Sequence, residues 1–246
     1  PISLVSQEVQ ILGKEKVYGV IGIKPPHLTT IEERKKPIKI EQLYIDTGYS
    51  KEKISEIIKV GDVIGIKRKP TELKNNCLTA RALDNKAGIA VMLETAKELD
   101  NINHKSNVFF TATSQEEVGL KGAHTSSHKI NPDLAIIIDV GFGYTPELNK
   151  NDTLELNKGP GIVIGSNANP MLNKKIIEVA NKYNFKFQYE VNPGSSGTDA
   201  AAIQVSRLGI PCIIISLPLR YMHTTVETVN IKDIENTGRL IAKFIN

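Results

Sequence analysis

The pattern of hydrophobic and polar positions differs between the first third of the chain and the rest, and this difference divides the chain into two regions. In its first third, short apolar runs such as EVQILG, VYGVIGI and DVIGIK are separated by glycines and by charged stretches. Short runs broken in this way are typical of a small β domain of the barrel or sandwich type. One helix is expected at 50–60, with Ser50 as its N-cap. We therefore predict a small, β-barrel-like domain over residues 1–75.

From Leu78 onward, the patterns of strand and helix alternate, which predicts a mostly parallel sheet with helices on both faces. The predicted helices lie at 85–99, 170–183, 198–209 and 230–245, and the predicted buried strands at 107–113, 133–140, 161–166, 185–191 and 210–218. The apolar stripe of the first of these helices has helical spacing. It consists of Ile89, Met92, Leu93, Ala96 and Leu99. In the last helix, Asn230 and Asp233 resemble a capping box.

Composition and charge exclude some classes of protein. The 246 residues carry a net charge of +4, but the charges are interspersed and no basic stripe with aromatic residues occurs, which argues against nucleic-acid binding. The longest apolar runs are too short to span a bilayer. Cys77 and Cys212 lie far apart in a chain without secretory features, so reduced structural thiols are expected. With no visible signal peptide, we expect a cytoplasmic protein and no membrane contact.

Four carboxylates and one histidine follow predicted strands or open the first helix of the α/β region. They are Asp84, Glu116, Glu117, Asp139 and His223. Because ligands gather at the carboxyl ends of strands in such sheets, these side chains are expected to meet at one edge. Like charges that meet repel one another unless a cation neutralises them. Carboxylate and imidazole ligands suit zinc, cobalt or manganese.

The adjacent pair Glu116 and Glu117 needs two separate roles, because neighbouring side chains point in different directions on a strand or a helix. One glutamate would ligate a metal and the other would act as a base, while an aspartate bridges two ions. Taken singly, each of these residues is also typical of a solvated loop carboxylate, a helix cap or a half-buried histidine. The residues alone leave both interpretations open.

Five motifs occur in the order and context of the tetrahedral (TET) aminopeptidases, and the chain resembles that family over nearly its whole length. They are ARALDNKAG, TSQEEVGLKGA, AIIIDV, PGSSGTDAAAIQ and SLPLRYMHTTVE, and GVIGIKPPHL and LYIDTG resemble the family's small β domain. The family contains dinuclear metallopeptidases, including glutamyl and deblocking aminopeptidases, some of them once labelled endoglucanases. The resemblance implies a phosphorylase/hydrolase-like α/β/α sandwich over residues 76–246, peptide substrates, and assembly into dimers and then dodecamers.

The resemblance also implies a role for each candidate site residue. Asp84 would bridge two divalent ions, zinc or cobalt, with Glu117 and His223 completing one site and Asp139 contributing to the other. Glu116 would be the general base that activates the metal-bridging water. Further residues would surround the substrate pocket: Gly197, Thr198, Asp199 and Arg220.

One departure from the family pattern concerns the first histidine ligand, which the family carries in a segment before its β domain. This sequence begins with Pro1 at what resembles the first strand of that domain, and His27 belongs to the β domain by motif. We therefore expect the second ion to be bound weakly, activity to be low and the chain to aggregate.

Three other interpretations are compatible with parts of the sequence. The first is a non-catalytic assembly subunit of the same fold. The second is glycoside hydrolysis by paired carboxylates, which the absence of tryptophan disfavours. The third is a metal pair formed by His124 and His128, which stand one helical turn apart without the glutamate of an HExxH motif. We expect these two histidines on an exposed helix face.

Overall fold

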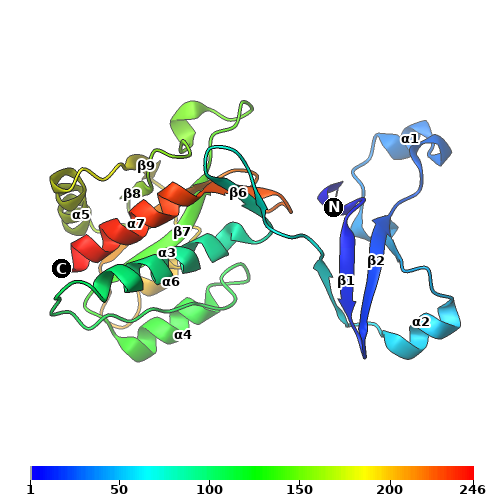
Figure 1. Ribbon diagram of the computed structural model, residues 1–246, viewed down its shortest axis with the longest axis horizontal. Coiled ribbons are helices and arrows are strands. Elements are labelled where there is room, and N and C mark those ends of the chain that lie inside the picture. The colour runs from blue at the N-terminus through cyan, green and yellow to red at the C-terminus, as the bar shows by residue number, and fades with distance from the viewer. Residues whose placement is uncertain (1) are drawn as a thin grey trace. The chain divides into compact units, whose positions relative to one another are not determined.

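The structure is a computed structural model that describes residues 2–246. Pro1, which was expected at the first strand of the β domain, lies outside the described residues. The chain divides into two compact units, residues 1–70 and 71–246. Figure 1 shows the first unit in blue to cyan and the second in cyan to red.

The first unit is built on a four-stranded antiparallel sheet with the order β3-β2-β1-β4. Its strands and its longer helix are β1 (Glu8–Leu12), β2 (Lys16–Gly22), β3 (Tyr44–Asp46), β4 (Val63–Ile66) and α2 (Lys51–Ile57). Ser50 caps α2 by accepting a hydrogen bond from the Lys53 N–H, as predicted. The isoleucine face of α2 packs on one face of the sheet, against Ile11 and Val17. Within the described residues this sheet is open and does not close into a barrel.

The second unit is an α/β structure around a mixed sheet with the order β7-β10-β8-β9. These strands are β7 (Ala135–Phe142), β10 (Cys212–Leu219), β8 (Gly161–Gly165) and β9 (Gln188–Asn192). β10 is parallel to β7 and β8 is parallel to β9, whereas β10 and β8 are antiparallel. Every residue of β10 is buried, which explains its continuous apolar sequence.

Helices cover both faces of this sheet (Figure 1). They are α3 (Leu83–Leu99), α4 (Lys121–Ile130), α5 (Pro170–Lys182), α6 (Ala200–Ile203) and α7 (Ile231–Ile245). α3 packs against α7 and β7, and α5 packs against α7, while α4 contacts α6. A small antiparallel sheet, β11-β6-β5, lies beside them, with β11 (Glu227–Asn230), β6 (Cys77–Ala80) and β5 (Thr71–Glu72).

The buried face of α3 differs from the predicted stripe. Only Leu99 of that stripe is buried, and Leu93 is exposed. The face toward the protein interior is made instead of smaller residues, chiefly Ala87, Gly88, Val91 and Thr95. The Thr95 hydroxyl donates a hydrogen bond to the Gly238 carbonyl of α7. Small side chains are needed there because the two helices approach closely, which hydrophobicity alone does not reveal.

Two further helical features differ between the prediction and the structure. The helix expected at 198–209 is regular only over α6 and then breaks into tight turns, with Arg207 in the left-handed region at φ 53°. Asn230 caps α7 through the Lys232 N–H, as predicted. Asp233, however, does not complete a capping box, because its carboxylate accepts hydrogen bonds from the N–H groups of Asn157 and Gly159.

The predicted strand at 107–113 is wrong as an assignment of secondary structure. No strand among residues 2–246 pairs with this segment, and the side chains of Phe109 and Phe110 are 66% and 46% exposed. An apolar run becomes a strand only where its backbone groups find ladder partners. Asp139 also differs from its predicted place, since it lies within β7 and not at its end.

Candidate metal centre

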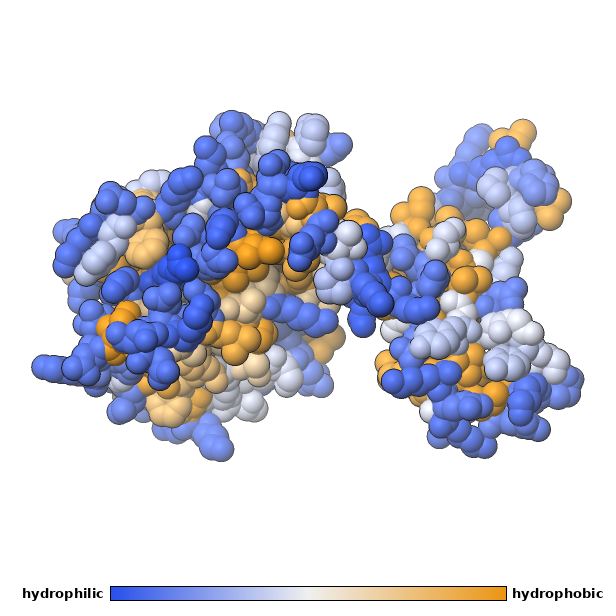
Figure 2. All heavy atoms as spheres, in the orientation of Figure 1, coloured by the Kyte–Doolittle hydropathy of each residue, from blue (hydrophilic) through white to orange (hydrophobic). Residues whose placement is uncertain are grey.

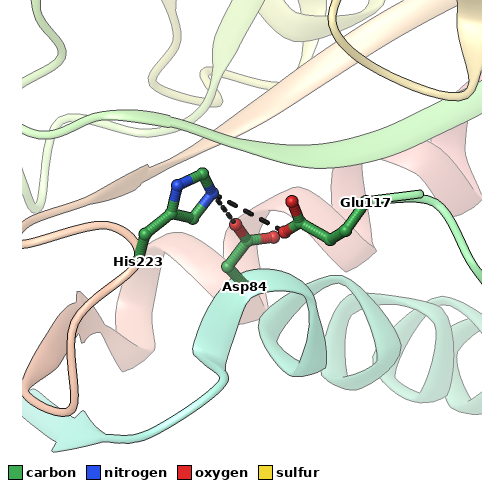
Figure 3. A group of neighbouring side chains, drawn as sticks. All are labelled: Asp84, Glu117 and His223. Atoms are coloured by element: carbon green, nitrogen blue, oxygen red, sulfur yellow. Dashed lines mark ion pairs between the residues drawn. The ribbon is translucent and has the colours of Figure 1, made fainter. Parts of the chain in front are cut away.

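Asp84, Glu117 and His223 meet at one point of the larger unit (Figure 3). Asp84 lies in the first turn of α3, Glu117 in the loop before α4, and His223 in the loop after β10. One ligand atom from each residue lies within 4.8 Å of the other two. The Nε2 atom of His223 is 3.2 Å from Asp84 Oδ2 and 3.6 Å from Glu117 Oε1.

These separations fit a shared metal ion. Ligand atoms that bind a tetrahedral zinc ion at about 2.0–2.2 Å stand roughly 3.3–3.5 Å from one another. The two distances from His223 Nε2 fall around that span. The Asp84 side chain is 12% exposed, whereas those of Glu117 and His223 are each 64% exposed, so the cluster has a buried side and an open side. The donor set of two carboxylates and one imidazole is therefore suited to a divalent ion.

The backbone around this cluster adopts unusual conformations. Ala82, Gln115 and His223 have positive φ values of 54°, 60° and 61°, a region that non-glycine residues rarely occupy. Such conformations persist only where the surrounding structure holds them, and they gather at functional sites. Each of the three segments that carry the cluster contains one of these residues. This concentration supports a functional interpretation of the cluster.

Asp139 is largely buried beside the cluster. Its Oδ1 atom accepts hydrogen bonds from the Val140 N–H at 2.9 Å and from Asn85 Nδ2 at 3.2 Å. Burial raises the pKa of this carboxyl to about 7, although the bond from Val140 opposes the shift, and the charges of Asp84 and Glu116 add to it. Asn85 was missed by the sequence analysis, although it directly follows Asp84 in the motif.

Glu116 lies next to the cluster without belonging to it. Burial raises the pKa of its carboxyl, and the negative charges of Glu117, Asp199 and Asp84 raise it further. The pKa of Asp84 is raised in the same way, first by burial and then by Glu117 and Glu227. The cluster therefore concentrates negative charge in a partly desolvated place, which a bound cation would relieve.

The residues expected around the substrate pocket are only partly brought to this place. Asp199 lines the same cavity as the carboxylates, and its Oδ2 atom accepts a 2.6 Å hydrogen bond from the Thr113 hydroxyl. Thr198 bonds to Ser196 Oγ, and Gly197 faces open space. Arg220 is directed elsewhere, since its Nε donates to the Tyr144 carbonyl at 2.8 Å.

An open cavity of about 1320 Å³ extends from the acidic residues into the larger unit. Asp84, Glu116, Glu117, Asp139 and Asp199 line one part of it. Its remainder is largely apolar and runs between β7 and the unpaired segment 107–113. Figure 2 shows hydrophobic residues exposed among hydrophilic ones on the surface of the chain.

The two histidines of α4, His124 and His128, are both exposed. The exposed helix face that was predicted for them is therefore present.

Known proteins share this fold and these motifs. The profile of the M42 glutamyl aminopeptidase family matches residues 1–240. The chain is 33% identical over 244 residues to a lysyl aminopeptidase of Pyrococcus furiosus, covering 98% of this chain and 70% of that protein. The TET aminopeptidase of the marine sediment archaeon Thaumarchaeota archaeon SCGC AB-539-E09 superposes with a TM-score of 0.91 and 32% identity, over 99% of this chain and 71% of the other.

A third similar structure is the TET1 peptidase of Pyrococcus horikoshii, which can assemble into a tetrahedron or a large octahedral shell. It superposes with a TM-score of 0.82 and 33% identity, over 99% of this chain and 72% of the other. The fold and the matched motifs thus define an aminopeptidase-type hydrolase with a mixed α/β fold. The chain belongs to the M42 aminopeptidase family.

Among the described residues, the helices are all too short or too polar to span a membrane.

Proposed function

We propose that this protein is a metal-dependent aminopeptidase that removes N-terminal residues from peptides. The observation that carries the proposal is the convergence of Asp84, Glu117 and His223 at distances that suit one divalent ion. Membership of the M42 family supports the reaction class. The name of the lysyl aminopeptidase relative supports a peptide substrate.

The two proposed metal ions have different numbers of protein ligands. Asp84, Glu117 and His223 would hold the first ion, and Asp84 and Asp139 would hold the second. Bound zinc or cobalt would polarise the scissile carbonyl and make water more acidic. Among the described residues, the second ion has two assigned ligands, whereas a catalytic zinc ion usually has three. The first position is therefore expected to bind its ion more tightly.

Glu116 would carry the proton during hydrolysis. Its raised pKa makes it a better base toward water than an ordinary surface glutamate, and its position beside Glu117 places it at the edge of the ligand cluster. Glu116 would accept a proton from the attacking water and then donate it to the amine of the leaving peptide. The two adjacent glutamates would thus have separate roles, one in binding the ion and one in proton transfer.

The charge of the cavity supports a substrate with a free amine. Two carboxylates that are not proposed as ligands, those of Glu116 and Asp199, line the cavity beside the proposed metal ligands, and the N-terminal ammonium of a peptide is positively charged at neutral pH. An acidic cavity attracts such a group and disfavours a carboxylate terminus. Asp199, which lies in the same cavity with one carboxylate oxygen buried and unpaired, is the proposed contact for the substrate.

Assembly into a closed homo-oligomer, with dimers combining into a dodecamer, is part of the same proposal. The assembly of the Pyrococcus horikoshii TET1 peptidase into closed shells supports it. A shielded interior would admit small peptides and exclude folded proteins.

The decisive experiment counts bound ions. Elemental analysis after gel filtration should find zinc or cobalt in the wild-type chain and little in Asp84→Ala, because Asp84 is assigned to both ions. Cleavage of amino-acid p-nitroanilides should follow metal content. The matched control is Asp46→Ala, which removes an exposed carboxylate from the smaller unit. Full metal content in Asp84→Ala would remove Asp84 from the centre of the site.

A further inference from the structure

Glu227 is a buried carboxylate behind the metal cluster. Only 2% of the residue is exposed, and it is the first residue of β11. Its cross-strand partner in β6 is Ala80, which leads into the segment that carries Asp84. A buried carboxylate is unfavourable unless hydrogen bonds satisfy it. Its two oxygens are bonded to two different ligand-bearing segments.

The first bond reaches the segment that begins α3. The backbone N–H of Asp84 donates to Glu227 Oε2 at 3.1 Å. The second bond reaches the loop after β10, where the backbone N–H of His223 donates to Glu227 Oε1 at 2.9 Å. One carboxylate therefore joins the backbones of two of the three residues in the cluster, which are 139 positions apart in the sequence.

The second bond acts on a strained residue. His223 has a φ of 61°, so its backbone is in the left-handed region, which is unfavourable for a non-glycine residue. A charge-assisted hydrogen bond to its N–H stabilises that conformation. The imidazole of this residue lies 3.2 Å from the Asp84 carboxylate only while both backbones keep their positions.

From these contacts we infer that Glu227 is a positioning residue of the metal centre, which fixes Asp84 and His223 at the separation that one divalent ion requires. Glu227 does not touch the ion and acts through the two ligands. The inference rests on the proposed function, because it assigns the cluster to a metal. Outer partners of metal ligands typically change metal affinity by about 10–100-fold when they are replaced.

The test compares Glu227→Gln with Asp233→Asn in the 246-residue chain. Asp233 is an equally buried carboxylate, 2% exposed, that accepts two backbone N–H bonds from residues remote from the cluster. Each amide has nearly the shape of the acid but can accept only one of the two N–H bonds. Both variants should lower the stability of the metal-free protein, since each leaves a buried donor without its partner.

Only Glu227→Gln should weaken metal binding, by about 10–100-fold in the Kd for Co²⁺. It should also alter the visible absorption spectrum of the bound cobalt, which reports ligand geometry and which a purely structural role would not change. Glu227→Asp, whose shorter side chain can reach only one of the two segments, should give an intermediate Kd. Asp233→Asn should keep the wild-type Kd and spectrum.

The failure of the inference can be distinguished from that of the proposed function. If the wild type binds Co²⁺ through Asp84 while Glu227→Gln has the same Kd and spectrum, the positioning role is wrong and the metal centre stands. If the wild type binds no Co²⁺, both are wrong. If Glu227→Gln unfolds while Asp233→Asn stays folded, Glu227 is a residue of general stability and the inference is also overturned.

Discussion

At the scale of single residues, the adjacent glutamates are the clearest case of two neighbours in different environments. Glu117 contributes an oxygen to the cluster with Asp84 and His223, whereas Glu116 stands outside it with a raised pKa. The difference follows from chain geometry, because successive side chains cannot point to the same place.

This difference predicts opposite behaviour of two matched variants. Glu116→Gln should retain the bound metal and lower kcat by roughly 10²–10⁴-fold, the usual span for a lost general base. Glu117→Gln should lose metal from the first position. Elemental analysis and steady-state kinetics on the same preparations provide the comparison. Equal loss of metal in both variants would contradict the assigned roles.

The raised pKa of Asp139 predicts the pH dependence of stability in the metal-free protein. Its carboxyl has a pKa of about 7 when folded, against an ordinary value of 3.8. Between these values the folded chain holds a proton that the unfolded chain does not hold, so the free energy of unfolding falls as pH rises through this window. The stabilising contribution is complete below about pH 3.8 and lost above about pH 7.

Thermal denaturation of metal-free protein between pH 4 and pH 7.5 tests this sign. Asp139→Asn should show a smaller loss of Tm over that range than the wild type does. Some loss should remain, because the pKa values of Asp84 and Glu116 are raised in the same direction. A variant with the same slope as the wild type would exclude Asp139 as the main titrating group.

At the scale of elements, the packing of α3 against α7 depends on a close approach at Gly238. A Cβ atom at this position would lie 2.7 Å from the Cβ of Glu94 and 3.1 Å from the backbone nitrogen of Thr95. Neither atom is the flexible end of a side chain, so one helix would have to shift.

Gly238→Ala should therefore lower the free energy of unfolding by about 1–3 kcal/mol, the usual effect of overpacking. Helix propensity alone predicts the opposite sign, a gain of about 1 kcal/mol for alanine in a helix interior. Urea denaturation followed by circular dichroism distinguishes the two. A higher midpoint in the variant would show that the helices can separate freely at this position.

The segment 107–113 shows how an element depends on its neighbours. Its sequence has the composition of a buried strand, yet it runs without a ladder partner along the apolar part of the cavity, and its two phenylalanines are exposed. The local sequence specifies an extended apolar segment, but strand pairing requires a second strand beside it.

At the scale of the whole molecule, one face of the small unit's sheet exposes several apolar side chains. Leu12, Tyr18, Val20 and Val63 are each about half-exposed or more and are on the face opposite to the isoleucine cluster, as the strand registers show. Exposed apolar faces of this kind often mark contacts between proteins. The small unit thus has a surface suited to the proposed assembly.

Tyr18→Lys combined with Val20→Lys should disrupt that assembly, because charges on an apolar contact oppose its burial. Multi-angle light scattering at micromolar concentration should show a closed oligomer for the wild type and smaller species for the double variant. Leu208→Lys is the control, since this leucine is fully exposed on the larger unit. A wild type that is monomeric would contradict the proposed assembly, and an unchanged oligomer in the double variant would exclude this face.

The sequence by itself indicated the α/β class and the positions of most helices and strands, and the resemblance of its motifs to those of a known family singled out Asp84, Glu117 and His223 as candidate ligands. Hydrophobic periodicity and capping residues are local signals. The candidate ligands follow from the resemblance to a known family, which also needs no tertiary information. The helix caps Ser50 and Asn230 are examples, because each bonds within its own first turn.

Only the tertiary structure decided features that join distant parts of the chain. In α3, the face with small residues is the buried one, because the partner helix α7 approaches closely there. The tertiary structure left 107–113 unpaired, since pairing depends on a neighbouring strand. It joined Glu227 to Asp84 and His223 through backbone N–H groups, which have no side-chain signature in a sequence. The positions of the proposed ligands could be predicted from the sequence through the family resemblance, but the contacts that hold these residues are made across the fold.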